Sequence, residues 1–267
     1  MAITVERQAN CVNFLQIVMT MMEKSRLKWI KSLQLKKYRQ AEQCFLVQGY
    51  KAVEVLLDST FEVVEILTTK EFSDRFHAKI NGLNRSVRFS TVQDSVLESL
   101  GSFQSNDAVL AVVRMKPEEN ITAGKGLILL LDSIRDPGNL GTIIRTADWF
   151  GVSKIVLSPT CVDFYNPKVI SATMGSFCHI NFCYTDLTQF IRAASLPVYG
   201  AFLNGKNIQT VNFNPNGLIC IGNESHGISP EVEACISDRV TIPGYGYAES
   251  LNASVAAGIF LYAATKV

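Results

Sequence analysis

The chain has 267 residues, of which 48% are hydrophobic and 18% charged, and its formal net charge is +1. This length allows two modest domains or one large one, and the apolar content excludes a wholly disordered chain. No apolar run is long enough to span a membrane. The apolar stretch of residues 10–22 follows Glu6 and Arg7 and lacks a small-residue cleavage site, so we expect neither a membrane segment nor a signal peptide.

Seven cysteines are scattered along the chain without any C-x-x-C pair. An odd number with no paired spacing predicts reduced thiols in a cytoplasmic protein, with neither a disulfide framework nor a zinc site. Cys178, His179 and Cys183 lie close together in a strand-like stretch, where two thiols and one imidazole are more typical of a core than of metal ligands. We therefore expect no bound metal.

The charge is distributed unevenly. Residues 1–117 carry 16 basic and 12 acidic residues, whereas residues 118–267 carry 9 and 12. Residues 24–39 hold seven basic residues and no acidic one, interleaved with Trp29 and Tyr38. Such a segment is either a solvated helix face or a phosphate-binding surface with rings available for stacking, and the segment alone favours neither. The candidate RNA-binding side chains are Lys28, Lys31, Lys36, Lys37 and Arg39.

Residues 21–116 predict a small α/β domain. Hydrophobic periodicity and turn residues predict, in order, strand 44–49, helix 50–59, strand 61–69, helix 71–81 with Gly82 beyond its end, and strand 108–115. Residues 117–126 contain proline, glutamates and glycines without apolar periodicity, so we expect a linker. Residues 1–20 fit no element, and we expect a disordered extension or a stretch upstream of the true start, at Met21 or Met22.

A regular alternation of strands and helices begins at residue 127. Residues 127–132 form an apolar run typical of a strand covered on both faces, and a helix over 140–150 follows, with Asn139 placed to cap it and Gly151 to end it. The later elements are strand 154–158, helix 166–177, helix 186–195, strand 197–203, strand 217–222, helix 229–236, strand 240–243 and a terminal helix that starts near Ser250. Residues 127–267 therefore predict an α/β domain with a parallel sheet, whose ligands bind beyond the carboxyl ends of the strands.

Arg145 falls on the outer face of the predicted helix 140–150. At about 100° per residue it lies nearly opposite the apolar stripe and one turn from Trp149. The stripe consists of Leu140, Ile143, Ile144, Ala147 and Phe150. By default this arginine is a solvated charge beside a partly covered indole. The alternative is that a partner or a substrate covers this face.

Three loops at strand ends are rich in glycine and small polar residues, as expected where backbone wraps a ligand closely. They begin after the strands that end near 132, 221 and 241. The third loop offers only two glycines of a dinucleotide fingerprint, in the wrong strand–turn–helix context. Around Ser225 the first glycine of a hydrolase elbow is missing, and the adjacent His226 would point away from it. The sequence therefore favours neither a dinucleotide-binding site nor a serine hydrolase site.

Together, the segments NLGTIIRTADWFG, IGNESHGIS and IPGYGYAESLNASVAAGI resemble, in order and spacing, the three motifs of the SpoU (TrmH-type) RNA 2′-O-ribose methyltransferase family of the SPOUT superfamily. The resemblance covers about residues 127–264. The N-terminal part is similar to the ribosomal-protein-like substrate-binding domain often fused to these enzymes, on KKYR…FLVQGYKAVEVLL and SFQSNDAVLAVV. The resemblance implies S-adenosylmethionine (AdoMet) as methyl donor, a ribose 2′-hydroxyl as acceptor, and a deep trefoil knot in the C-terminal domain.

The resemblance also implies the site residues. Donor binding falls to backbone groups of Gly222, Ile242 and Leu251, with Leu203 as a neighbour. The polar active-site residues are Asn139, Arg145, Glu224, Ser250 and Asn252. The asparagines and the serine stand at predicted helix starts, where capping is worth about 1 kcal/mol each, and the two roles are compatible. Gly244 and Ser225 depart from the family pattern, which often has Met and Gly, respectively, at these positions. Both residues lie in loops that the resemblance assigns to donor binding.

Members of this family are obligate homodimers whose site is completed at the interface, so the resemblance implies a cover for Arg145. The small residues Ala253, Ala256, Ala257 and Gly258 fit either close helix contact between copies or tight packing within the knot. The family mechanism gives the hydroxyl proton to the arginine, although a guanidinium is a very weak base. In the alternative, Arg145 clamps the adjacent phosphate and polarises the hydroxyl, and the proton leaves through the phosphate or Glu224.

The leading hypothesis is a cytoplasmic, homodimeric enzyme that methylates a ribose 2′-hydroxyl of structured RNA, with ribosomal RNA favoured over transfer RNA by analogy. One alternative is a non-catalytic RNA-binding or ribosome-assembly factor on the same fold, which the intact set of five polar residues disfavours. Another is a knotted methyltransferase that acts on a base nitrogen, which the SpoU-type motifs disfavour.

Overall fold

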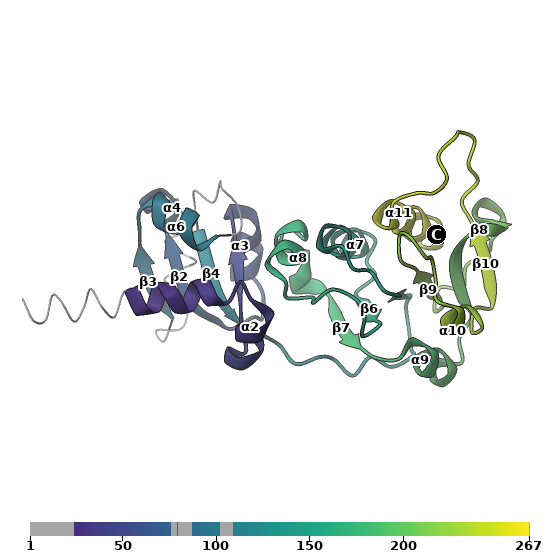
Figure 1. The fold of residues 1–267 in the computed structure, drawn as a ribbon, viewed down its shortest axis with the longest axis horizontal. Coiled ribbons are helices and arrows are strands. Elements are labelled where there is room, and N and C mark those ends of the chain that lie inside the picture. The colour runs from purple at the N-terminus through teal and green to yellow at the C-terminus, as the bar shows by residue number, and fades with distance from the viewer. Residues whose placement is uncertain (1–23, 76–78, 80–86, 102–108, 267) are drawn as a thin grey trace, which may run out of the picture. The chain divides into compact units, whose positions relative to one another are not determined.

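A computed structural model of the chain describes residues 24–75, 79, 87–101 and 109–266. The predicted extension over residues 1–20 lies outside the described residues. The chain forms two compact units (Figure 1). The first comprises Met1–Leu46 with Val63–Arg114, and the second Val47–Glu62 with Met115–Val267.

The first unit is built on a four-stranded sheet with the strand order β1-β4-β2-β3. The strands are β1 (Cys44–Gln48), β2 (Val63–Thr68), β3 (Arg88–Thr91) and β4 (Val109–Arg114). Strand β2 runs antiparallel to β4 and parallel to β3. Residues 24–32 are helical, and α2 (Lys36–Glu42), α4 (Lys70–Arg75) and α6 (Asp94–Leu100) follow; α3 (Tyr50–Leu57) falls in the second unit.

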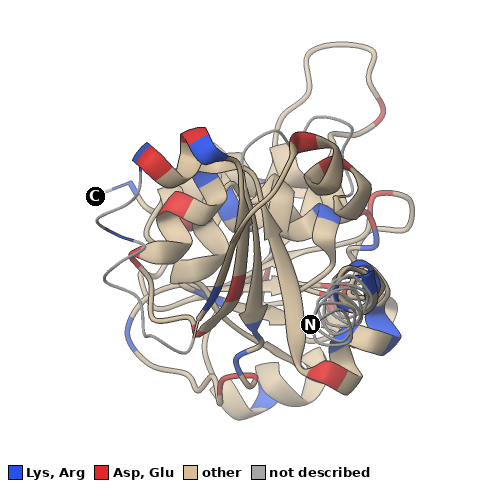
Figure 2. Ribbon diagram, turned by 90° about the vertical axis from the view of Figure 1, so that its left-hand side faces the viewer, with Lys and Arg blue, Asp and Glu red and all other residues tan. Residues whose placement is uncertain are grey.

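The core of the first unit joins the basic N-terminal helix to the sheet. Ile30 and Leu33 are fully buried and belong to one cluster with Leu46, Leu67 and Leu110 of strands β1, β2 and β4. Their apolar surface is removed from water, which holds the helix over residues 24–32 with the side chains of Lys24, Lys28 and Lys31 outward. Figure 2 shows the Lys and Arg positions at this N-terminal end of the described ribbon.

The second unit contains a six-stranded sheet in which every pairing is parallel, with the order β10-β8-β9-β5-β6-β7. Its strands are β5 (Ile128–Leu131), β6 (Lys154–Leu157), β7 (Asn181–Tyr184), β8 (Val198–Asn207), β9 (Leu218–Ile221) and β10 (Asp238–Thr241). This confirms the predicted α/β class with a parallel sheet. The trefoil knot stays a prediction, because strand order alone does not define how the chain threads.

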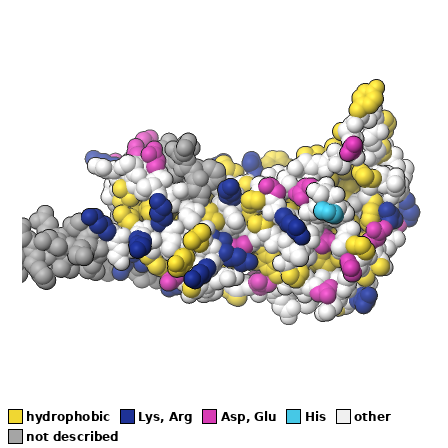
Figure 3. Space-filling model, viewed as in Figure 1, with side chains coloured by type: hydrophobic (Ala, Val, Ile, Leu, Met, Phe, Trp, Pro, Cys, Tyr) yellow, Lys and Arg dark blue, Asp and Glu magenta, His cyan; other side chains and the backbone are white. Residues whose placement is uncertain are grey.

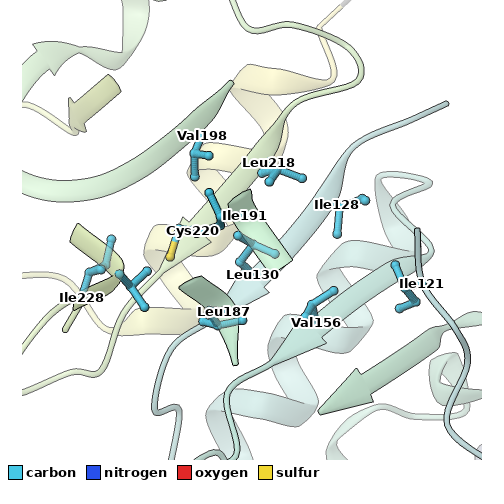
Figure 4. Close-up of a cluster of buried hydrophobic side chains, with 11 residues drawn as sticks. Ile121, Ile128, Leu130, Val156, Leu187, Ile191, Val198, Leu218, Cys220 and Ile228 are labelled. Atoms are coloured by element: carbon cyan, nitrogen blue, oxygen red, sulfur yellow. The ribbon is translucent and has the colours of Figure 1, made fainter. Parts of the chain in front are cut away.

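Helices cover both faces of this sheet (Figure 1). On one face, α9 (Leu187–Ala194) and α10 (Pro230–Glu233) pack through Leu187, Ile191 and Val232 onto Leu130 and Cys220 of the central strands (Figure 4). The helices α7 (Pro137–Trp149), α8 (Pro167–Ala172) and α11 (Ala253–Ala264) pack together on the other face. Burial on two faces explains the uninterrupted apolar runs of the strands.

Strands β5, β6, β9 and β10 all end at the same edge, since the sheet is parallel. The loops that follow them therefore meet there, which is where an open parallel sheet binds its ligands. Within the described part of the chain no helix is long and apolar enough to cross a membrane.

Candidate active site

Helix α7 starts three residues earlier than the sequence analysis predicted, and this changes the role of Asn139. Asp136 is the N-cap, its side chain accepting a hydrogen bond from Asn139 N at 2.8 Å, and Pro137 occupies the first helical position. The prediction that Asn139 caps this helix was therefore wrong. Because Asp136 satisfies the backbone there, the Asn139 amide is available for other partners.

The loop after β9 is closed by its own backbone. Asn223 and Gly227 exchange two backbone hydrogen bonds of 2.9 Å each, and the Asn223 side-chain oxygen accepts from the backbone N–H of Ser225 and His226. A Cβ atom added to Gly222 would lie 2.2 Å from the carbonyl carbon of Gly227. Only glycine permits this close approach, so the backbone of the loop is fixed by its sequence.

A one-way chain of hydrogen bonds joins all three motif loops. The Asn252 amide, before α11, donates from Nδ2 to Asn139 Oδ1 at 2.9 Å. The Asn139 amide, in the first turn of α7, donates from Nδ2 to Glu224 Oε1 at 2.5 Å. Glu224 lies in the loop after β9 and also accepts from Asn223 Nδ2 at 3.4 Å. The charged acceptor at the end of the chain strengthens the amide donors before it.

Asn252 serves two purposes. Its side-chain oxygen accepts from Ser254 N at 2.9 Å and from Ser254 Oγ at 2.6 Å, which caps α11, while its nitrogen donates to Asn139. The predicted compatibility of capping and site roles therefore has a geometric basis: the oxygen and nitrogen of one amide are divided between them.

Two further residues hold the loops in place, and the sequence analysis did not identify either. The buried Asp132 carboxylate, just after β5, accepts from both Ser229 N and Ser229 Oγ, at 2.8 and 2.7 Å. The Asn223 amide donates to the Ser133 carbonyl at 2.9 Å. The sequence does contain a signal for Asp132, because an acidic residue directly after a buried strand needs hydrogen-bond donors. For Asn223 the signal is the turn-forming pattern Asn-Glu-Ser-His-Gly.

Arg145 and Ser250 are not part of this hydrogen-bond chain. Arg145 is exposed on α7, six residues after Asn139, and its guanidinium has no hydrogen-bond or ion-pair partner among the described residues. Ser250 is exposed in the segment before α11. The sequence placed Arg145 on the outer face of its helix, and the structure agrees.

Of the candidate donor-binding residues, Gly222, Ile242 and Leu251 lie on these loops and Leu203 lies in β8. Gly222 and Ile242 are half-buried, whereas the apolar side chains of Leu203 and Leu251 are exposed. Thr241 Oγ1 donates to the Leu203 carbonyl at 2.9 Å and ties β8 to the end of β10. Exposed apolar side chains beside fixed loop backbone fit a nucleoside-bearing donor such as AdoMet, which needs apolar contacts and backbone polar groups to hold it.

The basic segment divides into two kinds of residue. Lys28, Lys31, Lys36 and Lys37 are exposed. Arg39 is only 2% exposed, and its Nη1 donates to the carbonyls of Leu33 (3.1 Å) and Gln34 (2.9 Å). These carbonyls follow the helix over residues 24–32, so Arg39 satisfies backbone acceptors and does not present its charge on the surface.

The buried thiols nearest the site are inert. Burial raises the pKa of the Cys161 thiol, whose Sγ donates to the Leu131 carbonyl at 3.2 Å, and burial also raises the pKa of Cys220 in β9. A raised pKa keeps each sulfur neutral and therefore a poor nucleophile. In the described parts of the chain, no three His, Cys, Asp or Glu side chains gather as metal ligands would.

Comparison with known proteins gives this site a family. Residues 126–262 match the SpoU rRNA Methylase family, and residues 24–111 match the MRM3-like substrate binding domain. The chain is 32% identical over 237 residues to the 23S rRNA (guanosine(2553)-2′-O)-methyltransferase RlmP of Bacillus subtilis (strain 168), with 87% of this chain and 92% of the relative covered.

Two solved structures extend the similarity to the fold. The AdoMet-bound rRNA methyltransferase from Sinorhizobium meliloti has a TM-score of 0.80 at 29% identity, covering 89% of this chain and 93% of that one. The SpoU methyltransferase AviRb from Streptomyces viridochromogenes, in complex with the cofactor AdoMet, has a TM-score of 0.79 at 26% identity, covering 90% and 96%. The chain therefore belongs to the SpoU rRNA methylase family and carries an MRM3-like substrate-binding domain before its methylase domain.

Proposed function

We propose that this enzyme transfers a methyl group from AdoMet to a ribose 2′-hydroxyl of structured RNA, with ribosomal RNA favoured over transfer RNA. The observation that carries the proposal is the hydrogen-bond chain from Asn252 through Asn139 to Glu224, which unites three motif loops at the ligand-binding edge of the sheet. The names of the relatives support ribosomal RNA, since RlmP is described as acting on 23S rRNA.

AdoMet, when bound, supplies an electrophilic methyl group. The chain's own task is to hold the donor and the acceptor hydroxyl in line and to keep water out. Gly222, Ile242 and Leu251 would hold the donor through loop backbone, with Leu203 adding apolar contact. No general acid is needed for the leaving group, because departure of a sulfonium neutralises its charge.

The acceptor hydroxyl must lose a proton as it attacks. A guanidinium is a poor base, so we assign to Arg145 the role of holding the neighbouring phosphate and polarising the hydroxyl. Glu224 is the ionisable member of the hydrogen-bond chain and one candidate acceptor for this proton, and the substrate phosphate is the other. Asn139 and Asn252 orient the Glu224 carboxylate, while Ser250, in the same loop as Asn252, contacts the substrate. We keep these five residues as the proposed catalytic set.

We also propose a homodimer, which would cover the outer face of α7. Trp149 on this helix is 84% exposed, and Val255 and Tyr262 of the adjacent α11 are exposed as well. Tyr262 packs on Phe150 with 6.2 Å between ring centroids, so the rings of the two helices form one surface. Large exposed apolar side chains on neighbouring helices are typical of an interface. Trp149→Glu should yield a monomer by light scattering; an unchanged mass would refute this interface.

The N-terminal unit would bind the substrate RNA through its exposed lysines. Arg26 stacks over the Trp29 ring at 3.8 Å, and Lys37 lies 5.6 Å from the Tyr38 ring. Lys28, Lys31, Lys36 and Lys37 remain the proposed phosphate contacts, and Arg39 leaves this set because it is buried. The unpaired cysteine spacing supports the cytoplasm as the compartment.

The decisive experiment maps 2′-O-methyl groups in RNA from cells with and without this protein. The expected result is the loss of one or a few ribose methyl groups from ribosomal RNA, restored by wild-type protein and not by Glu224→Ala. Restoration by the Glu224→Ala variant would favour a non-catalytic assembly role. Loss of a base methyl group in place of a ribose methyl group would overturn the reaction proposed here.

A further inference from the structure

The segment between β10 and α11 carries two aromatic rings that nothing in its own unit covers. Residues 244–250 are all exposed, and Figure 1 shows this loop extending away from the sheet and the helices. Tyr245 is 91% exposed and Tyr247 is 106% exposed. Figure 3 shows hydrophobic side chains at the far end of the loop. Such complete exposure of two large rings in one loop is unusual for a folded protein and indicates a binding surface.

The local backbone leaves both rings unobstructed. Gly244 and Gly246 flank Tyr245, and a Cβ atom added to either glycine would meet nothing within 4 Å. On the Cβ side of these two glycines, the loop therefore has no close neighbour among the described residues. The rings are free to adopt the orientation that a ligand requires.

We propose that Tyr245 and Tyr247 stack on unpaired bases of the substrate RNA next to the ribose that receives the methyl group. This inference rests on the proposed RNA substrate. Proteins recognise structured RNA mainly at single-stranded loops, bulges and ends, where unstacked bases expose their faces. Aromatic side chains replace the lost stacking, and they do so for any base sequence.

The position of the loop fits this task. Asn252 is five residues after Tyr247 and donates to Asn139 in the candidate active site. Five extended residues span at most about 18 Å and the seven that separate Tyr245 from Asn252 at most about 25 Å, so both rings lie within a few nucleotides of the reacting hydroxyl.

The charge of the loop also selects bases over phosphates. Residues 244–250 contain no Lys or Arg, and their single charged residue is Glu249. The loop therefore offers nothing to a phosphate, and the two rings are its recognition groups. A second copy of the chain is a poorer occupant, because the exposed apolar residues on α7 and α11 already provide a surface for it.

The test compares two double variants: Tyr245→Leu with Tyr247→Leu, and Tyr245→Phe with Tyr247→Phe. The probe is a short fluorescent single-stranded oligoadenylate, bound at several salt concentrations. We expect the Leu pair to weaken binding by about tenfold or more, since stacking is worth this much per base or pair of bases, and the Phe pair to bind as wild type does. The salt dependence should stay unchanged, because no phosphate contact is lost.

The other outcomes of the binding, calorimetry and light-scattering measurements each overturn the stacking proposal. Wild-type protein that does not bind the oligoadenylate, a Leu pair that binds as tightly as wild type, or a Phe pair as weak as the Leu pair would exclude stacking. Loss of AdoMet affinity by calorimetry would assign the rings to the donor pocket, and loss of dimer mass to the second copy. Wild-type protein that shows the expected stacking but methylates no RNA would refute the proposed function and leave the stacking intact.

Discussion

Replacing Asn139 by aspartate should set two carboxylates against each other in the candidate active site. The Asn139 amide now donates to Glu224 Oε1 at 2.5 Å, and Asn139→Asp removes the donor and adds a second negative charge. Two unit charges about 4 Å apart repel by about 4 kcal/mol at an effective dielectric constant of about 20. Both residues are half-exposed, so solvent screening should reduce the net loss of stability to about 1–2 kcal/mol.

The repulsion should depend on pH in a defined direction. It raises the pKa of the carboxylate pair in the folded state above the unfolded values of about 4. The loss of stability is therefore absent well below pH 4, where both groups are protonated, and grows as the pH rises from the unfolded pKa toward the raised folded pKa. We expect the melting temperature of Asn139→Asp to lie about 2–8 °C below that of wild type at pH 8, with a smaller difference at pH 5.

Asn207→Asp is the matched control. The Asn207 side-chain oxygen accepts from Gln209 N at 2.9 Å at the start of the short 3-10 helix η2 (Ile208–Thr210), a role that a carboxylate fills equally well. Its melting temperature should follow that of wild type at both pH values. Differential scanning calorimetry at pH 5 and pH 8 measures all three proteins. An Asn139→Asp variant as stable as wild type at pH 8 would show that Asn139 and Glu224 are not in contact in solution.

Three other perturbations have distinct expected outcomes. Arg145→Ala should leave AdoMet affinity and stability nearly unchanged and reduce single-turnover methylation by at least ~10²-fold. Arg145→Lys should not restore the rate, because an ammonium lacks the planar fork of a guanidinium. Methylation by Arg145→Ala near the wild-type rate would show that Arg145 is a solvated charge. Lys36→Glu with Lys37→Glu should weaken RNA binding and flatten its salt dependence, and unchanged RNA affinity would contradict the assignment of these lysines to RNA binding. Arg39→Ala should instead lower the free energy of unfolding by about 2–4 kcal/mol, and an equally stable variant would contradict the structural role of Arg39. Gly222→Ala should cost about 1–3 kcal/mol and weaken AdoMet binding in calorimetry, because its Cβ atom would overlap the backbone of the same loop; wild-type values for both would refute the close approach.

The sequence predicted every strand of the parallel sheet except β7, which was expected only as a strand-like stretch. Apolar runs such as that of β5 are unambiguous, because a strand covered on both faces has no polar alternation. Strand β3 and helix α6 were not predicted: all four residues of β3 are exposed, so no hydrophobic pattern marks it. Residues Arg88–Thr91 form a strand because their backbone pairs with β2, and not because of a hydrophobic pattern in their own sequence.

The candidate site was predictable as a set of residues and not as a geometry. Motif order identified Asn139, Glu224 and Asn252, and the structure brings these three together. Helix start signals were present at Asp136 and Pro137, but Asn139 also satisfies the composition rule for a cap, and only the backbone decides between them. Arg39 shows the same limit, since its position in a basic segment does not reveal that it bonds the carbonyls of Leu33 and Gln34.

The hydrogen-bond chain has a consequence for how the enzyme folds. Its two links join residues 85 and 113 positions apart in the sequence, so the site has a high contact order. Contacts this distant form late, after the loops between them have closed. Asn252 also follows all six strands of the sheet, and during synthesis the site forms only once α11 is available to dock. In refolding, activity should return after the helical signal has recovered, with the final step set by the docking of α11 against α7.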